Sequence, residues 1–120
     1  MLKDDLYKIN RLDFDGDTIN AQVAVDPTHK IFDGHFPGQP VLPGVCTVEI
    51  LKELVGEVQG RKMKLSDANN MKFLSLVDPS KTNILNFTIQ LNEDGDAIKI
   101  NASAQLEDDT STFKIKGTLI

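Results

Sequence analysis

Residues 34–45 read Gly34-His35-Phe36-Pro37-Gly38-Gln39-Pro40-Val41-Leu42-Pro43-Gly44-Val45, and Glu49 follows four positions later. Three of the five prolines and three of the eight glycines of the chain fall in this stretch. Such a density of these two residue types stiffens a loop and fixes unusual backbone angles. Because apolar side chains are interspersed among them, we predict a packed, rigid loop that ends where a Pro-Gly pair opens a helix.

The one clear helix is predicted over residues 45–58. Gly60, followed by Arg61 and Lys62, is typical of a helix end. Residues at helical spacing form an apolar face of Leu51, Leu54, Val55 and Val58, and a polar face of Glu49, Lys52, Glu53 and Gly56. We therefore expect Glu49 to face away from the core.

Strands are predicted on both sides of this helix, where apolar and polar residues alternate: 6–14, 18–25, 70–76, 82–91, 97–106 and 110–119. Turn-forming residues separate several of them, as in Asp15-Gly16-Asp17 and at 92–96. Long strands adjacent in sequence favour antiparallel pairing in meander order. The predicted fold is α+β, a single domain over residues 1–120 with an antiparallel sheet curled around one helix.

Composition excludes several classes of protein. The chain has 120 residues, 40% hydrophobic and 26% charged, which is typical of a soluble globular domain and not of a disordered chain or a long coiled coil. A single cysteine excludes an intrachain disulfide framework and a four-cysteine metal site, and two histidines leave little material for a histidine-rich one, so no metal is expected.

The net charge of −5 argues against a nucleic-acid-binding protein. Residues 52–81 are the exception, with six Lys or Arg against four Asp or Glu, so this stretch alone suits an acidic partner. We see neither a signal peptide nor an apolar run long enough to span a membrane. The expected location is the cytoplasm, without a membrane partner.

The stretch that opens this section also supplies the parts of an acid–base site. His35 is a base in a rigid turn, and Glu49 is a carboxylate in the second turn of the helix. The helix N-terminus at Gly44 offers unpaired N–H groups and a partial positive charge. Taken singly, each part is more often structural: a hydrogen-bonded histidine, a solvated glutamate and a helix start signal.

Taken together, the parts resemble the signature of the 3-hydroxyacyl-acyl carrier protein dehydratases of fatty-acid synthesis. The match covers Gly34–Val45 nearly position for position, and the fourteen positions from His35 to Glu49 are the family's spacing. Met71-Lys72-Phe73 with Val77-x-Pro79 resembles a later family motif more weakly, since Ser80-Lys81 replaces its Gly-Asp. An upstream Pro-His-Arg-x-Pro-Phe motif is absent, so the chain is more similar to compact dehydratases of specialised acyl or polyene pathways.

This resemblance implies a hotdog fold and dehydration of a (3R)-3-hydroxyacyl thioester to the trans-2-enoyl thioester. His35 would take the α-proton, and Glu49 would protonate or orient the departing hydroxyl. The backbone at Gly44 and Val45 would bind the thioester oxygen. The resemblance further implies no cofactor, a substrate carried on the phosphopantetheine of an acyl carrier protein, and a homodimer or higher oligomer whose sites take the histidine and the acid from different subunits.

Other residues rank lower in this interpretation. Cys46 is better explained as a small apolar filler than as a nucleophile, and His29 is predicted at the surface. Arg61, Lys62 and Lys64 could dock an acidic carrier protein, although favourable charge at a helix C-terminus explains them equally well. Two alternative functions stay open: a hotdog thioesterase, and a non-catalytic acyl-carrier-binding partner subunit.

Overall fold

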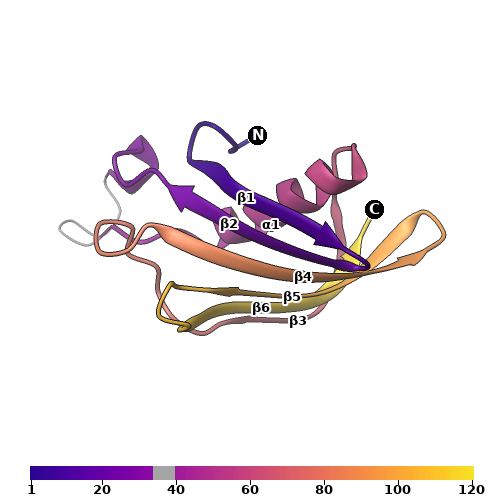
Figure 1. Ribbon diagram of the computed structural model, residues 1–120. Helices are drawn as coiled ribbons and strands as arrows, with labels where there is room; N and C mark the ends of the chain where they lie inside the picture. The colour runs from indigo at the N-terminus through magenta and orange to yellow at the C-terminus, as the bar shows by residue number, and fades with distance from the viewer. Residues whose placement is uncertain (34–39) are drawn as a thin grey trace.

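The computed structural model describes residues 1–33 and 40–120. Six antiparallel strands form one sheet, and Figure 1 shows them curving around a single α-helix, which lies behind them in this view. The α+β hotdog fold predicted from the sequence is confirmed. The elements are β1 (Tyr7–Asp15), β2 (Thr18–Val25), the 3-10 helix η1 (Lys30–Phe32), α1 (Gly44–Gln59), β3 (Leu65–Phe73), β4 (Ile84–Asp94), β5 (Ala97–Gln105) and β6 (Ser111–Leu119).

The sheet is amphipathic because its strands alternate. Along β2, β4 and β5 every second side chain is buried in the core, and those on the other face are half-buried or exposed. Gly16 and Gly95 take positive φ angles of 65° in the two tightest hairpins, which link β1 to β2 and β4 to β5. The second of these turns is shorter than predicted, because β4 continues to Asp94.

The strand order is β1-β2-β4-β5-β6-β3, so the predicted meander is wrong at one point. β3 lies at the sheet edge and pairs with β6, where Met71 is opposite Ile115. It also begins at Leu65, earlier than the predicted residue 70. Two register shifts along β3 break the two-residue period by which a strand is recognised, and polar edge residues obscure it further.

Helix α1 confirms the predicted helix to within one residue at each end. Its sheet-facing side chains Ile50, Leu51, Leu54 and Val55 are fully buried and form the centre of the core. Gly60 ends it with a φ of 72°, and its N–H donates to the carbonyl of Gly56 at 2.8 Å. In the described part of the chain, no helix has the length and apolar character needed to cross a bilayer.

Candidate active site

Backbone amides at the start of α1 form one part of the candidate site. Pro43 precedes the helix in an extended conformation, and its carbonyl accepts the N–H groups of Cys46 at 2.9 Å and Thr47 at 3.3 Å. Helix geometry therefore leaves the N–H groups of Gly44 and Val45 outside the intrahelical ladder. These two amides, with the positive end of the helix dipole, can bind developing negative charge.

The glycine at this helix start has a structural reason as well. A Cβ atom built on Gly44 would lie 2.7 Å from Cε1 and Cζ of Phe73, so the phenyl ring already occupies the space a side chain would need. Phe73 comes from β3, and its ring packs at a tilt on Phe113 with the centroids 5.0 Å apart. Phe73 and Gly44 are about thirty residues apart in the sequence, so the sequence pattern could not reveal this contact.

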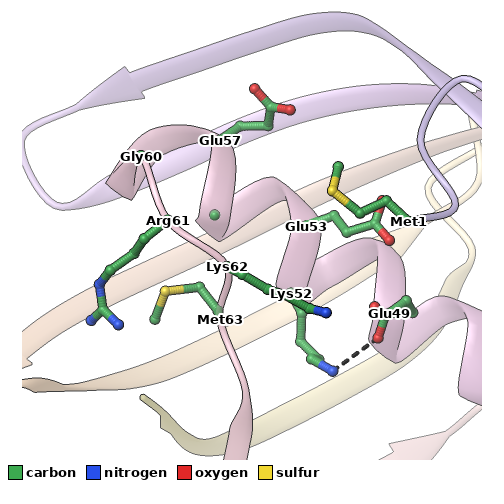
Figure 2. A pocket seen from close by; sticks show the side chains of 10 residues that line it. Met1, Glu49, Lys52, Glu53, Glu57, Gly60, Arg61, Lys62 and Met63 are labelled. Carbon is green, nitrogen blue, oxygen red and sulfur yellow. Dashed lines mark hydrogen bonds and ion pairs between the residues drawn. The ribbon is translucent and has the colours of Figure 1, made fainter.

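Glu49 lies on the outward side of α1, as its place on the helix predicts. Its Oε2 accepts a hydrogen bond from Lys52 Nζ at 2.9 Å, drawn as a dashed line in Figure 2. The two side chains are 33% and 22% exposed. The expected acid is thus an ion-paired carboxylate within this chain, a form that can accept a hydrogen bond from a hydroxyl group.

Two hollows meet at Glu49. The first, of about 400 Å³, lies at the helix start and is lined by Met1, Leu2, Val45, Cys46 and Glu49. The second, of about 300 Å³, follows the outer face of α1 toward its C-terminus and is the one drawn in Figure 2. Most of its exposed lining is apolar, and Met63 lies at its far end. The Glu49 carboxylate, the exposed residue Val45 at the start of α1 and an apolar surface therefore adjoin one another.

Cys46 is 5% exposed in the first turn of α1. Burial raises the pKa of its thiol above the ordinary value, and the charge of Glu49 adds to the effect. A thiol held in the protonated state is a poor nucleophile. The structure therefore favours the interpretation of Cys46 as a packing residue.

The basic residues Arg61, Lys62 and Lys64 lie in the connection from α1 to β3 and are exposed. Arg61 and Lys62 both line the hollow drawn in Figure 2, and Lys64 does not. Arg61 also donates to the carbonyl of Asp96 at 3.2 Å. The backbone of Lys64 pairs with Ile120. Their role in carrier docking stays a prediction.

Sequence reasoning missed Glu53, which it placed on the polar face of the helix. The residue is 8% exposed, and its carboxylate accepts three hydrogen bonds: from the N–H of Leu2 at 2.8 Å, the N–H of Lys3 at 2.9 Å and the hydroxyl of Tyr7 at 2.9 Å. Burial, together with the Glu53 carboxylate, raises the pKa of Tyr7 far above its ordinary value, so the phenol stays a donor. The helical pattern could not reveal partners about fifty residues away.

The expectation that His29 lies at the surface is also wrong. Its side chain is 11% exposed, and Nδ1 accepts the N–H of Ile31 at 3.0 Å, which caps η1. Since Nδ1 is an acceptor, Nε2 carries the proton and points to the Asp5 carboxylate at 3.2 Å. His29 is therefore a structural histidine that links η1 to the first residues of the chain.

The proposed base, His35, lies outside the described residues, so its assignment stays a prediction carried by the sequence motif. Within residues 1–33 and 40–120, no group of three or more His, Cys, Asp or Glu side chains could hold a metal ion. The described part of the site thus consists of Glu49, its partner Lys52, the helix-start amides and the two hollows.

Comparison with known sequences points to dehydratases. The family described as "ApeI-like: ApeI dehydratase" matches residues 11–116. The 3-hydroxyacyl-[acyl-carrier-protein] dehydratase FabZ of Oenococcus oeni is 34% identical over 86 residues, which cover 66% of this chain and 62% of that protein. FabZ of Lactobacillus helveticus is 30% identical over 100 residues, which cover 78% of this chain and 67% of that protein. The chain thus spans about two thirds of the length of these relatives.

Solved structures support the fold. A chain of the dehydratase heterocomplex ApeI:P from Xenorhabdus doucetiae superposes with a TM-score of 0.74 at 24% identity, covering 92% of this chain and 95% of that one. A mutant thioesterase PA1618 from Pseudomonas aeruginosa gives a TM-score of 0.63 at 14% identity, covering 92% and 78%. At these identities the similarity establishes the hotdog architecture and does not distinguish dehydration from thioester hydrolysis.

Proposed function

Because this chain belongs to the ApeI-like dehydratase family, we propose that it dehydrates (3R)-3-hydroxyacyl thioesters to trans-2-enoyl thioesters in fatty-acid biosynthesis or a related acyl or polyene pathway. The observation that carries the proposal is the His35–Glu49 motif, with Glu49 beside the exposed start of α1 and at the junction of two hollows. A dehydratase needs these parts: a base, a group for the leaving hydroxyl, and donors for the thioester oxygen.

In the proposed reaction, His35 removes the α-proton, and negative charge develops on the thioester oxygen. The N–H groups of Gly44 and Val45 and the dipole of α1 stabilise that charge; one such donor is typically worth about 10²–10³ in rate. The β-hydroxyl leaves as water after taking a proton, and the electron pair of the broken C–H bond forms the new double bond. Glu49 donates that proton, or it orients the hydroxyl while His35 returns the proton that it removed from the α-carbon.

The site is proposed to be shared by two copies of the chain. Glu49 faces away from its own sheet, so its carboxylate is open to a histidine from a second copy of the chain. The edge strand β3 supports this arrangement, because apolar side chains are exposed on its helix-facing side and in the residues after it: Met71, Phe73, Leu74 and Leu76. An exposed edge with apolar side chains favours pairing with another chain. The proposed assembly is a homodimer or a larger homo-oligomer.

The proposed substrate is carried on phosphopantetheine of an acyl carrier protein, so no other cofactor is required. Carrier proteins of this chemistry are acidic, and residues 52–81 carry six Lys or Arg against four Asp or Glu in a chain whose net charge is −5. Arg61, Lys62 and Lys64 are therefore the proposed contacts. The proposed reaction belongs to the cytoplasm, where the carrier would be encountered.

The test is to incubate the purified chain with (3R)-3-hydroxyacyl thioesters of several lengths, on a carrier protein and on pantetheine, and to identify products by mass. Loss of one water from the thioester, abolished by His35→Ala, is the expected result. Release of free thiol and a hydroxy acid would instead identify a thioesterase. Stoichiometric binding without turnover, in the chain alone and with a second hotdog subunit added, would identify a non-catalytic partner.

A further inference from the structure

Residues 1–6 form a strap that crosses α1 and is anchored by a buried carboxylate. Both oxygens of Glu53 are used: Oε2 accepts the N–H of Leu2, and Oε1 accepts the N–H of Lys3 and the Tyr7 hydroxyl. The strap folds back on itself, since the N–H of Leu6 donates to the carbonyl of Leu2 at 2.8 Å. Leu6 is fully buried in the core. A buried carboxylate that lost these donors would be left unpaired at a cost in free energy, so the strap is held in place.

This anchor places the first two side chains of the strap beside the candidate site. Met1 and Leu2 line the first hollow together with Val45, Cys46 and Glu49. Met1 also lines the second hollow, as Figure 2 shows, and its side chain is 79% exposed. Glu53 lies one helical turn after Glu49, so the anchor and the proposed catalytic carboxylate share one rigid element. The strap is therefore a wall of the site whose position is fixed relative to Glu49.

We propose that Met1 and Leu2 of this strap contact the acyl chain of the substrate and set its accepted length, with Glu53 as the positioning residue that holds them. The inference rests on the proposed function, since it takes the occupant of the first hollow to be a 3-hydroxyacyl group. Residues 1–6 lie outside the family motif, and the inference gives them a role in the choice of acyl-chain length. The strap's two apolar side chains suit contact with methylene groups, and the main-chain anchor keeps them in place.

The experiment measures substrate preference in three variants. Leu2→Trp reduces the first hollow, so the ratio of kcat/KM for long over short acyl chains should fall. Leu2→Ala enlarges it, so the ratio should rise. A single methylene contact in an apolar pocket is worth roughly 10–200-fold, so we expect a change of at least about tenfold. Glu53→Gln keeps an acceptor oxygen for Lys3 and Tyr7 but places an NH₂ group opposite the N–H of Leu2, which loosens the strap at Leu2. The ratio should therefore shift toward that of Leu2→Ala.

Asp4→Asn is the matched control for Glu53→Gln. It makes the same carboxylate-to-amide change in an exposed strap residue that lines neither hollow, and Asn tolerates the positive φ of 64° at this position. Hydrogen exchange of the Leu2 and Lys3 amides reports on the strap without any substrate. Exchange should accelerate in Glu53→Gln and stay as in the parent in Asp4→Asn.

The same preference is measured by binding, so that the result does not depend on turnover. Amide-linked 3-hydroxyacyl pantetheines of several lengths cannot be hydrolysed as thioesters and report affinity by calorimetry. Unchanged length ratios in both Leu2 variants, with turnover or binding intact, would overturn the strap as a specificity wall and leave the proposed function standing. If no analogue binds the parent chain and no thioester is dehydrated, the proposed function and the inference both fail.

Discussion

Glu49 and Lys52 form a pair whose contact fixes the direction of the proposed catalytic carboxylate. Lys52 Nζ lies 2.9 Å from Oε2 of Glu49. Lys52→Met removes this donor and keeps most of the side-chain length, so the carboxylate loses the contact that orients it. Because a misplaced catalytic group slows the chemical step, kcat should fall by about tenfold or more while KM changes little.

Values of kcat and KM for the parent, for Lys52→Met and for Lys8→Met test this prediction. Lys8 is exposed on β1 and lines neither hollow at Glu49, so its replacement should leave both values unchanged. A kcat for Lys52→Met equal to that of the parent would show that the ion pair does not position Glu49 for the reaction.

Cys46 provides a prediction about reactivity. Since burial raises the pKa of its thiol, less thiolate is present at any given pH than in the unfolded chain. Alkylation by iodoacetamide should be slower in the native chain than in urea by more than about tenfold, because the thiolate is the reacting form and is also covered. The alkylation rate of the native chain should begin to rise at a higher pH than the alkylation rate of the unfolded chain. Equal rates in the two states would mean that the first turn of α1 opens readily.

At the level of the elements, we expect the association of two copies of the chain to depend on the edge strand β3. Met71 is 39% exposed on β3, opposite Ile115 of β6. Met71→Lys places a charge on the proposed interface, so sedimentation should show a shift toward monomer and turnover should depend on protein concentration. Folding stability should change by no more than about 0.5 kcal/mol, as for other surface substitutions.

Phe14→Lys is the matched control for this change. Phe14 is an exposed apolar residue of β1, the strand at the other edge of the same sheet. The control should leave the sedimentation profile of the parent unchanged. If Phe14→Lys dissociates the oligomer and Met71→Lys does not, the interface lies at β1, and the proposed shared site must lie at that edge of the sheet.

The same elements show how much of the fold can be predicted from the sequence alone. Helix α1 and the two hairpins are local features, and period and turn residues were enough to predict them. β3 could not be placed, because two register shifts disrupt its alternation and its partner β6 is about forty residues away. Glu53 was misplaced for a related reason: a helical wheel shows which residues share a face, but not which distant segment covers that face.

On the scale of the whole molecule, the uneven charge of the chain bears on carrier binding. Reversal of Arg61, Lys62 and Lys64 to Glu should lower turnover of a carrier-linked substrate at low salt, because rim charges act mainly on association rate. The defect should shrink as salt rises, since the Debye length falls to about 8 Å at physiological ionic strength. A pantetheine thioester presents no acidic protein surface and should be turned over as by the parent. Equal losses with both substrates would indicate a damaged helix end.

The proposed shared site is a property of the assembled molecule and is tested by mixing two inactive chains. His35→Ala lacks the base and Glu49→Gln lacks the acid, so each homodimer is inactive. In a two-fold dimer that takes one residue from each subunit, a mixed dimer pairs the intact His35 of one chain with the intact Glu49 of the other. Random exchange then restores about a quarter of the parent turnover, because half of the dimers are mixed and each has one intact site.

Subunit exchange must be verified independently, for example by native mass spectrometry of two chains that carry different tags. A chain carrying both His35→Ala and Glu49→Gln, mixed with each single variant, is the control: every site of those mixed dimers lacks a group, so no activity should return. If verified mixed dimers of the two single variants stay inactive, His35 and Glu49 act within one chain. Glu49 would then have to be approached from the loop that precedes α1, and the outward direction of its side chain would need another cause than the partner subunit.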